Sequence, residues 1–138
     1  MRKLLTFCRT VYLAYFSQPA KDRVLYRAIC RTAPARILEL GMERGQRSTR
    51  LVEVVRRAQP GALPHYTGID LFELSSASGI PLKAAYCKLQ ATGARVRLVP
   101  GDPFTALAQS ANTIGQCDLI VVAASLDAES LRRAWFYV

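Results

Sequence analysis

The chain has 138 residues, of which 51% are hydrophobic, and it carries a formal net charge of +9 at pH 7. A chain of this length and composition can form one globular domain with a sizeable core, which excludes an intrinsically disordered protein. Its four cysteines stand far apart, and it has a single histidine. Because no zinc-site spacing can be built from them, we expect no metal site, and we expect reduced cysteines, as in a cytoplasmic protein.

The N-terminal segment 1–33 is predicted to form two helices ahead of the main core. Four residues recur at the spacing of one helical face: Leu4, Cys8, Val11 and Tyr15. We expect this face to dock on the chain's own domain; the alternative is a helix that binds a membrane surface or a partner, with the basic residues at positions 2, 3 and 9 outward. The second helix is predicted to have Ser17 as its N-cap and Pro19 in its first turn, and to end near Cys30. No transmembrane segment is expected.

From residue 35 the sequence alternates between short apolar strands and amphipathic helices. Strands are expected at 36–40, 66–70, 95–99 and 118–123, and helices at 46–58, 81–91, 103–110 and 127–136. Parallel strands joined by right-handed helical crossovers give an α/β, three-layer sandwich with a mostly parallel sheet. We therefore predict a single domain over residues 1–138, with a core at 35–127 and a terminal helix within 128–138.

The segment Ile37 to Thr49, with the sequence ILELGMERGQRST, predicts a strand, a tight turn and the start of a helix. Gly41 and Gly45 bound the turn, which we call the glycine loop, and they follow an E-x-G-x-x-x-G pattern rather than the G-x-G-x-x-G of dinucleotide sites. At such a turn, free backbone N–H groups and the positive end of the helix face a ligand at the edge of the sheet. A carboxylate at Glu39 would repel a pyrophosphate there and would suit a cationic amine.

Two more acids follow the next two strands at a regular interval. Asp70 lies in the segment PHYTGIDLFE and Asp102 in LVPGDPF, so the acids at positions 39, 70 and 102 are almost evenly spaced. Each interval matches one strand, helix and strand unit, which takes roughly 30 residues. The three acids should therefore line the carboxyl edge of one parallel sheet, the edge at which open α/β sheets bind ligands.

These segments resemble the cofactor-binding half of the class I S-adenosylmethionine-dependent methyltransferases, which have a Rossmann-like fold, and in particular small-molecule O-methyltransferases. The resemblance implies that the chain binds S-adenosylmethionine or its demethylated product. It also implies that Glu39 orients the glycine loop and holds the methionyl ammonium. Gly41 and Gly45 would then let the backbone approach the ligand closely, and Ser48 and neighbouring backbone amides would take the carboxylate.

The same resemblance assigns residues to the nucleoside part of the cofactor. Asp70 would accept hydrogen bonds from both ribose hydroxyls. Leu71 and Phe72 would pack on the adenine, and Asp102 would accept a hydrogen bond from its amino group. No catalytic residue can be named, and its absence does not exclude activity, because methyl transfer from a sulfonium depends mostly on the alignment of donor and acceptor. The methyl acceptor, a small molecule or a nucleic acid, is not identified.

The strand expected at 118–123 departs from the metal-dependent O-methyltransferases. In those enzymes it ends in an aspartate that holds a divalent ion, whereas this chain has Ala123, Ala124 and Ser125. A hard cation needs oxygen ligands, so we expect any methyl transfer to be independent of metal. Asp127 is predicted to cap the last helix, with Glu129 in its first turn.

The resemblance covers about residues 35–127 and stops at the fourth strand, where the family's sheet continues to a seventh. The fourth strand would then have an open outer edge close to the apolar end of the chain, Trp135 to Val138. Open strand edges favour pairing. We therefore expect either a fragment of a longer product or a fold that associates through this edge, for example as a homodimer.

The excess positive charge lies in the N-terminal part. Residues 1–60 contain 13 basic and 4 acidic residues, whereas residues 61–138 contain 6 of each. Four arginines lie in or after the glycine loop: Arg44, Arg47, Arg50 and Arg57. They form either a solvated basic face or an attractive surface for nucleic acid or another polyanion. The alternative to a methyltransferase is thus a non-catalytic binding or scaffold module that contacts nucleic acid through its basic part. An NAD-dependent or nucleotide-sugar enzyme is disfavoured by Glu39 and the glycine spacing.

Overall fold

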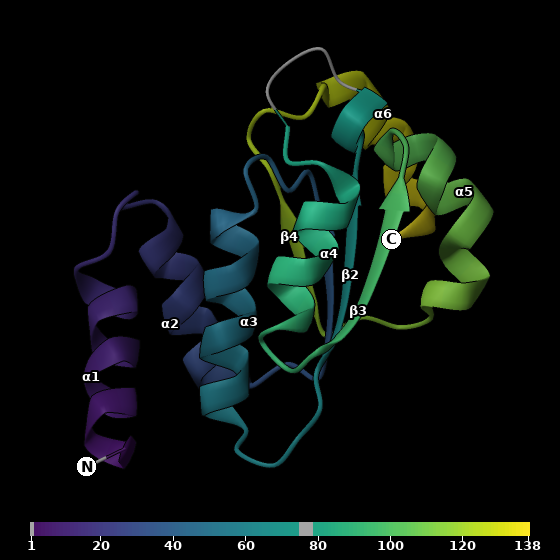
Figure 1. Cartoon of the computed structure of the whole chain (residues 1–138). Helices are drawn as coiled ribbons and strands as arrows, with labels where there is room; N and C mark the ends of the chain where they lie inside the picture. The colour runs from purple at the N-terminus through teal and green to yellow at the C-terminus, as the bar shows by residue number, and fades with distance from the viewer. Residues whose placement is uncertain (1, 75–78) are drawn as a thin grey trace.

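Helices and strands follow one another in the order that the sequence predicts (Figure 1). The computed structural model describes residues 2–74 and 79–138. The strands are β1 (Arg36–Leu40), β2 (His65–Asp70), β3 (Arg95–Pro100) and β4 (Leu119–Val122). The helices are α1 (Arg2–Tyr15), α2 (Asp22–Thr32), α3 (Gln46–Ala58), α4 (Leu82–Gln90), α5 (Pro103–Ile114) and α6 (Ala128–Ala134), with short 3₁₀ turns η1 (Phe72–Leu74) and η2 (Trp135–Tyr137).

The four strands form one parallel sheet in the order β3-β2-β1-β4. Near the end of β1, Leu40 pairs with Ile69 of β2 and with Val122 of β4, and Ile69 pairs in turn with Val99 of β3. The carboxyl ends of the strands therefore lie along one edge. This arrangement confirms the predicted α/β fold with its parallel sheet.

Helices cover both faces of the sheet (Figure 1). Helices α1 to α4 lie on one side, and α5 and α6 lie on the other. Neighbouring residues of a strand point to opposite faces, so Ile37 belongs to the core shared with α3 and α4, whereas Leu38 belongs to the core shared with α5 and α6. The predicted three-layer sandwich is thus confirmed.

The two helices of the second face each begin at an aspartate. Asp102 accepts hydrogen bonds from two backbone N–H groups of α5, at 3.0 and 3.2 Å, and Pro103 occupies a first-turn position whose N–H would have no helical acceptor. Asp127 accepts from the backbone N–H of Ser130 at 2.8 Å. Asp127 therefore caps α6 as predicted.

Helix α1 is present as predicted, but a different face docks. Leu13 is fully buried in the core shared with α2 and α3, whereas Leu4 and Tyr15 are 67% and 55% exposed. Arg9, which the membrane- or partner-binding alternative places outward, pairs with Glu53 of α3 at 3.1 Å. The predicted face was wrong because α1 is apolar on more than one side, so periodicity alone did not select the docked one. Neither α1 nor any other described helix is long and apolar enough to cross a bilayer.

The turn between α1 and α2 also differs from the expectation. Ser17 is buried and its hydroxyl donates to the carbonyl of Leu13 at 2.6 Å, so this side chain closes α1 instead of capping α2. Helix α2 starts at Asp22, after Lys21 and without a side-chain cap, and Pro19 lies in the turn before it. A serine hydroxyl can bond to the carbonyl four residues earlier as well as to a following N–H, and here it does the former.

Strand β4 pairs with β1 alone among the described strands, so its outer edge is open. Tyr137 and Val138, at the end of the chain, line a small hollow together with Ile120 of β4. Trp135 and Phe136 are 60% and 88% exposed. The apolar end of the chain is therefore only partly buried, and it lies on the face of the sheet that α5 covers.

Candidate functional site

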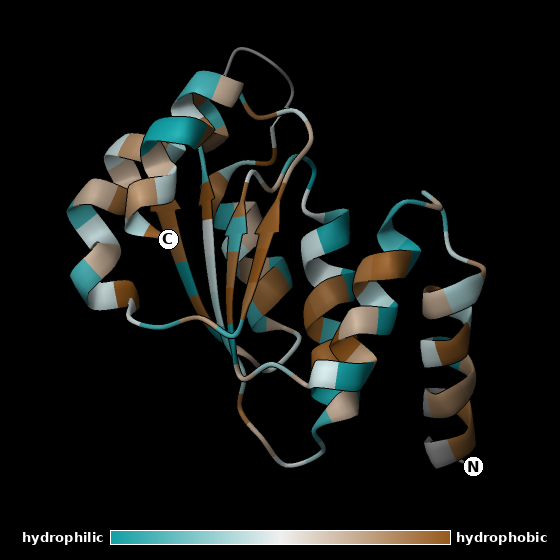
Figure 2. Ribbon diagram, turned by 180° about the vertical axis from the view of Figure 1, so that it is seen from behind, coloured by the Kyte–Doolittle hydropathy of each residue, from teal (hydrophilic) through white to brown (hydrophobic). Residues whose placement is uncertain are grey.

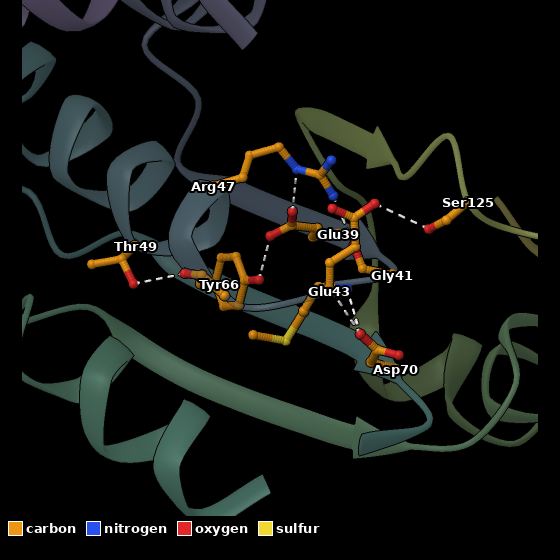
Figure 3. A network of polar contacts seen from close by, with 10 residues as sticks. Glu39, Gly41, Glu43, Arg47, Thr49, Tyr66, Asp70 and Ser125 are labelled. Carbon is orange, nitrogen blue, oxygen red and sulfur yellow. Dashed lines mark hydrogen bonds and ion pairs between the residues drawn. The ribbon is translucent and has the colours of Figure 1, made fainter. Parts of the chain in front are cut away.

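Three acidic residues lie at the carboxyl edge of the sheet, one for each of three strands. Glu39 is the last residue but one of β1, Asp70 is the last residue of β2, and Asp102 follows β3 by two residues. The parallel register places these strand ends side by side. The glycine loop, residues 41–45, leaves the same edge and leads into α3 (Figure 3).

The glycine loop passes very close to the end of β4. Gly41 and Gly45 have φ angles of +81° and +72°, a left-handed conformation that glycine adopts without strain. A Cβ atom on Gly41 would lie 2.7 Å from the Cβ of Ala123, so only glycine allows this approach. Glu43 also has a positive φ, +54°, and its carboxylate accepts a hydrogen bond from Ser125 at 3.0 Å (Figure 3). The loop is thus fixed to the residues that follow β4.

Glu39 is fully buried, and both of its carboxylate oxygens are engaged (Figure 3). Arg47 Nε donates to Oε1 at 2.8 Å, and the Tyr66 hydroxyl donates to Oε2 at 2.5 Å. Arg47 Nη2 also donates to the carbonyl of Gly41 at 2.8 Å. One guanidinium group therefore joins the end of β1, the glycine loop and the first turn of α3.

The surroundings fix the protonation states of the groups that hold Glu39. Burial lowers the pKa of Arg47, but the charge and hydrogen bond of Glu39 outweigh it, and the net pKa of Arg47 lies above its ordinary value. Burial, and then the Glu39 charge, raise the pKa of Tyr66 well above its ordinary value. Arg47 thus stays cationic and Tyr66 stays a hydrogen-bond donor near neutral pH. A ligand ammonium would reach Glu39 only if Arg47 moved aside.

Ser48 does not present its hydroxyl at this edge, contrary to the expectation. Ser48 is fully buried, and its Oγ makes no hydrogen bond among the described residues. Its hydroxyl nevertheless lies close to Tyr66 and lowers the pKa of that phenol. The reason is its position on the inner side of α3. The first N–H groups of this helix remain available, because Gly45 at the N-cap provides no side chain to cap them.

Asp70 holds the glycine loop in place. Its Oδ2 accepts from the backbone N–H groups of Met42 and Glu43 at 2.6 and 2.9 Å, and its Oδ1 accepts from the N–H of Leu71 at 2.7 Å. A carboxylate offers about four acceptor positions, so one remains, on Oδ1. Asp70 therefore anchors the glycine loop, a role that the sequence did not predict. The ribose contact expected of it stays a prediction.

The two residues after Asp70 are placed differently from each other. Leu71 is 38% exposed, whereas Phe72 is 2% exposed and belongs to the core on the α3 side. A contact of Phe72 with the adenine stays a prediction, and the buried ring is less available for it than Leu71 is. Its large apolar ring is stabilised more by burial in the core than by the rim of a site, and only Leu71 is left at the surface.

Asp102 uses one oxygen to cap the backbone of α5. Hydrogen bonding from the Thr105 side chain lowers the pKa of Asp102 most; burial opposes it, and the backbone N–H groups of Thr105 and Phe104 add to the lowering, so that the net pKa lies below its ordinary value. Both backbone cap bonds go to Oδ1. Oδ2 accepts neither of them and keeps acceptor capacity, so the cap and the contact predicted with an amino group are compatible.

The three residues directly after β4, Ala123, Ala124 and Ser125, carry no carboxylate, and the next acid, Asp127, caps α6. Ala123 is buried and Ser125 donates to Glu43. Within residues 2–74 and 79–138 the structure shows no group of three or more His, Cys, Asp or Glu side chains that could hold a metal ion.

The predicted basic face is largely occupied by contacts within the chain. Arg47 binds Glu39, Arg50 donates to the carbonyl of Gln18 at 2.5 Å, and Arg57 pairs with Glu53 at 2.6 Å. Of the four arginines, Arg44 alone has no such contact among the described residues. These side chains therefore do not present one free surface to a polyanion.

Arg47 and Tyr66 are the site residues that the sequence did not predict. Tyr66 could have been found: it lies two residues before Gly68, which pairs with Glu39, and residues two apart in a strand share a face. The small Gly68 leaves that face open beside Glu39. For Arg47 the sequence predicts a place in the first turn of a helix, but it does not predict that the side chain folds back toward the strand.

No protein-family profile matches the sequence, and no curated protein matches it significantly. Among solved structures, it is similar to the crystal structure of a putative O-methyltransferase from Klebsiella pneumoniae, with a TM-score of 0.50 and 24% sequence identity. The match covers 99% of this chain and 58% of that protein, so the chain spans less than two thirds of its length. With the sheet order and the parallel strands, this likeness shows a Rossmann-like fold of the methyltransferase type.

Proposed function

We propose that this chain binds S-adenosylmethionine, or its demethylated product, at the carboxyl edge of β1, β2 and β3, as the cofactor-binding part of a metal-independent methyltransferase. The observation that carries the proposal is the position of Asp70. It lies at the end of β2, it holds the glycine loop through two backbone N–H groups, and it keeps one acceptor position open for a ribose hydroxyl. The methyltransferase-type fold supports the same ligand.

Other groups at this edge fit the remaining parts of the cofactor. The exposed side chain of Leu71 offers an apolar surface for the adenine, and Oδ2 of Asp102 offers an acceptor for its amino group. The uncapped N-terminus of α3 suits the methionyl carboxylate, because its N–H groups and its dipole favour an anion. On the side where a Cβ would lie, Gly41 packs against Ala123, so its missing side chain serves the approach of the loop to the end of β4.

Glu39 takes part in this proposal as a positioning residue. Its buried carboxylate fixes Arg47, and Arg47 fixes the carbonyl of Gly41. Nη1 of Arg47 makes no hydrogen bond with the part of the chain that the structure describes. It is therefore a second candidate, beside the helix N-terminus, to hold the cofactor carboxylate.

When bound, the cofactor would supply an electrophilic methyl group, and the residues above would bind and orient it. No residue is assigned as a base, because alignment of donor and acceptor can account for most of the acceleration of a transfer from a sulfonium. The acceptor stays unassigned. The four cysteines are free, which supports a place in a reducing compartment, and we propose the cytoplasm.

The proposal is tested by calorimetry of the whole chain with S-adenosylmethionine, its demethylated product, NAD and ATP. We expect binding of the first two. Asp70→Ala should weaken it by about 1.5–3 kcal/mol, the contribution of a hydrogen bond to a charged group. A response to NAD alone, or silence throughout, contradicts the proposal.

Asp118→Ala is the matched control. The carboxylate of Asp118 also accepts two backbone N–H bonds, from Ala35 and Arg36 at 2.9 and 2.8 Å, but at the opposite edge of the sheet. Both variants lose the same kind of contact, and only Asp70→Ala should lose cofactor affinity. Equal losses in the two variants would assign the effect to general loosening of the fold.

A further inference from the structure

A cavity of about 200 Å³ lies at the other edge of the sheet, where the strands begin, against the end of α5. Its polar lining is basic or neutral: Arg36, His65, Arg95 and Arg97 together with Thr67 and Thr113. No carboxylate lines it. Figure 2 shows this lower end of the sheet as largely hydrophilic, in contrast to the apolar upper part of the strands.

The basic residues lie in register across three neighbouring strands. Arg36 of β1 pairs with His65 of β2, which pairs with Arg95 of β3. In the next row on the same face, Thr67 pairs with Arg97. Strands lie about 4.8 Å apart, so the first row spans roughly 10 Å. No two of the arginines are direct cross-strand partners, but all three lie on one face of the sheet and therefore repel one another.

The chain itself does not supply that opposite charge. The guanidinium groups of Arg36, Arg95 and Arg97 make no hydrogen bond or ion pair within the described ranges 2–74 and 79–138. Asp118 follows the cavity residue Cys117 in sequence, but its Oδ2 is engaged by two backbone N–H groups and it does not line the cavity. Arg36, Arg95 and Arg97 therefore line one hollow as exposed side chains whose guanidinium groups have no partner among the described residues.

Protection of an exposed strand edge does not account for the cluster. Charged side chains on an edge strand prevent pairing with another chain, and β3 is an edge strand here. That argument covers Arg95 and Arg97. It does not cover Arg36 and His65, because β1 and β2 are the two inner strands.

We infer that this cavity is a binding site for the phosphate group of a small phosphorylated ligand, separate from the cofactor edge. Guanidinium groups match phosphate oxygens in charge and in fork geometry, and the two threonine hydroxyls can supply further hydrogen bonds. A water molecule needs roughly 10–15 Å³ of such a volume, so the cavity has room for a phosphate group and part of the molecule that carries it. The small volume of the hollow favours a small ligand over the extended backbone of a nucleic acid.

The inference is tested on the whole chain by thermal unfolding in inorganic phosphate, compared with sodium chloride at matched ionic strength. We expect a saturable rise in melting temperature with phosphate. Arg95→Gln/Arg97→Gln should weaken the phosphate response about tenfold or more. In chloride the same variant should melt at or above the parent's temperature, because the repulsion within the cluster is relieved. A purely structural role for these arginines would lower it.

Two further variants make the result specific. Arg36→Gln removes a cation from β1 instead of β3 and should also weaken the response, which keeps the test open if the double variant fails to fold. Arg31→Gln removes an exposed arginine of α2 and should leave the response unchanged. Equal phosphate responses in the parent and in the cavity variants would overturn the inference. Binding of a single-stranded oligonucleotide that depends on Arg95 and Arg97, without any effect of phosphate, would overturn it in favour of a nucleic-acid surface.

Discussion

Arg47 and Glu39 form an ion pair of 2.8 Å that is almost closed to solvent, with side chains 11% and 0% exposed. The guanidinium belongs to the helix after the glycine loop, and the carboxylate belongs to the strand before it. Because the same guanidinium also binds the carbonyl of Gly41, the pair clamps the loop from both of its ends. The geometry of the candidate site therefore depends on a charge that is itself buried.

Arg47→Met should be among the most damaging single substitutions in this chain. It leaves the carboxylate of Glu39 buried with the Tyr66 hydroxyl as its remaining partner, and breaking a buried ion pair on one side costs about 3–5 kcal/mol. Urea unfolding at pH 7 measures the loss. Arg44→Met, at an exposed arginine of the glycine loop, should change the stability by no more than about 0.5 kcal/mol.

The double variant Arg47→Met/Glu39→Gln measures how much of the stability depends on the interaction between the two side chains. With no charge left to bury, it should recover a large share of the stability lost in Arg47→Met, because a neutral amide is far less costly to bury than an unpaired carboxylate. If the double variant were as unstable as the sum of two independent losses, the contact between the guanidinium and the carboxylate would not be the coupling that we describe.

Gly41→Ala should destabilise the fold through two separate effects. The left-handed φ of +81° costs a residue with a Cβ about 1–2 kcal/mol. Contact with Ala123 at 2.7 Å adds an overpacking cost of about 1–3 kcal/mol. Gly61→Ala is the matched control: its φ is +93°, and its added Cβ would meet no atom within 4 Å. Equal losses in the two variants would show that the loop does not pack tightly against the end of β4.

The strands and helices from residue 36 to residue 122 were predictable because local pattern and topology agree. The alternation of apolar and polar residues predicts the strands, and Gly45 and Asp102 lie directly before α3 and α5. The observed boundaries agree with the predicted ones to within a few residues. Helix α1 was less predictable in its packing. Its docked residue Leu13 and its exposed residue Leu4 are equally apolar, and tertiary contact decides between them.

The candidate site was predictable to the level of the backbone. The interval between Glu39, Asp70 and Asp102 places them at one edge in any parallel α/β sheet. Which atom each carboxylate accepts from depends on rotamers and on the exact course of the loop, and these follow from packing across elements. For that reason the sequence did not predict the hydrogen bonds from the loop to Asp70 or the ion pair of Arg47 with Glu39.

Acid should reveal the contribution of Asp102 to stability. Its folded-state pKa lies below its ordinary value of about 3.9, chiefly through hydrogen bonds from Thr105. A depressed carboxyl pKa adds stability above the unfolded-state pKa, and this stability is lost as the pH falls through the folded value. Asp102→Ala should therefore cost about 1 kcal/mol, as for other N-caps, at pH 6 to 8. The difference from the parent should shrink below about pH 4.

Asp102→Asn provides the comparison for that titration. An amide oxygen is also a good N-cap acceptor and does not titrate. The asparagine variant should keep most of the cap's stabilisation at neutral pH, and its own cap contribution should stay constant on acidification. A loss of stability in Asp102→Ala that is as large at pH 3 as at pH 7, in urea unfolding at both values, would contradict the assignment of the charge to the cap.

Strand β4 should mediate association between copies of the chain. Its outer edge is unpaired among the described strands, and exposed Trp135 and Phe136 lie next to the segment that packs near Ile120. Open backbone groups beside apolar side chains favour pairing with a second copy across a two-fold axis. We expect sedimentation velocity to show a dimer or larger species at high micromolar concentration, and Phe136→Asp to weaken the association. Leu74→Asp, at a residue 73% exposed and distant in sequence from that edge, should not. A parent chain that sediments as a monomer throughout would show that this edge needs no partner.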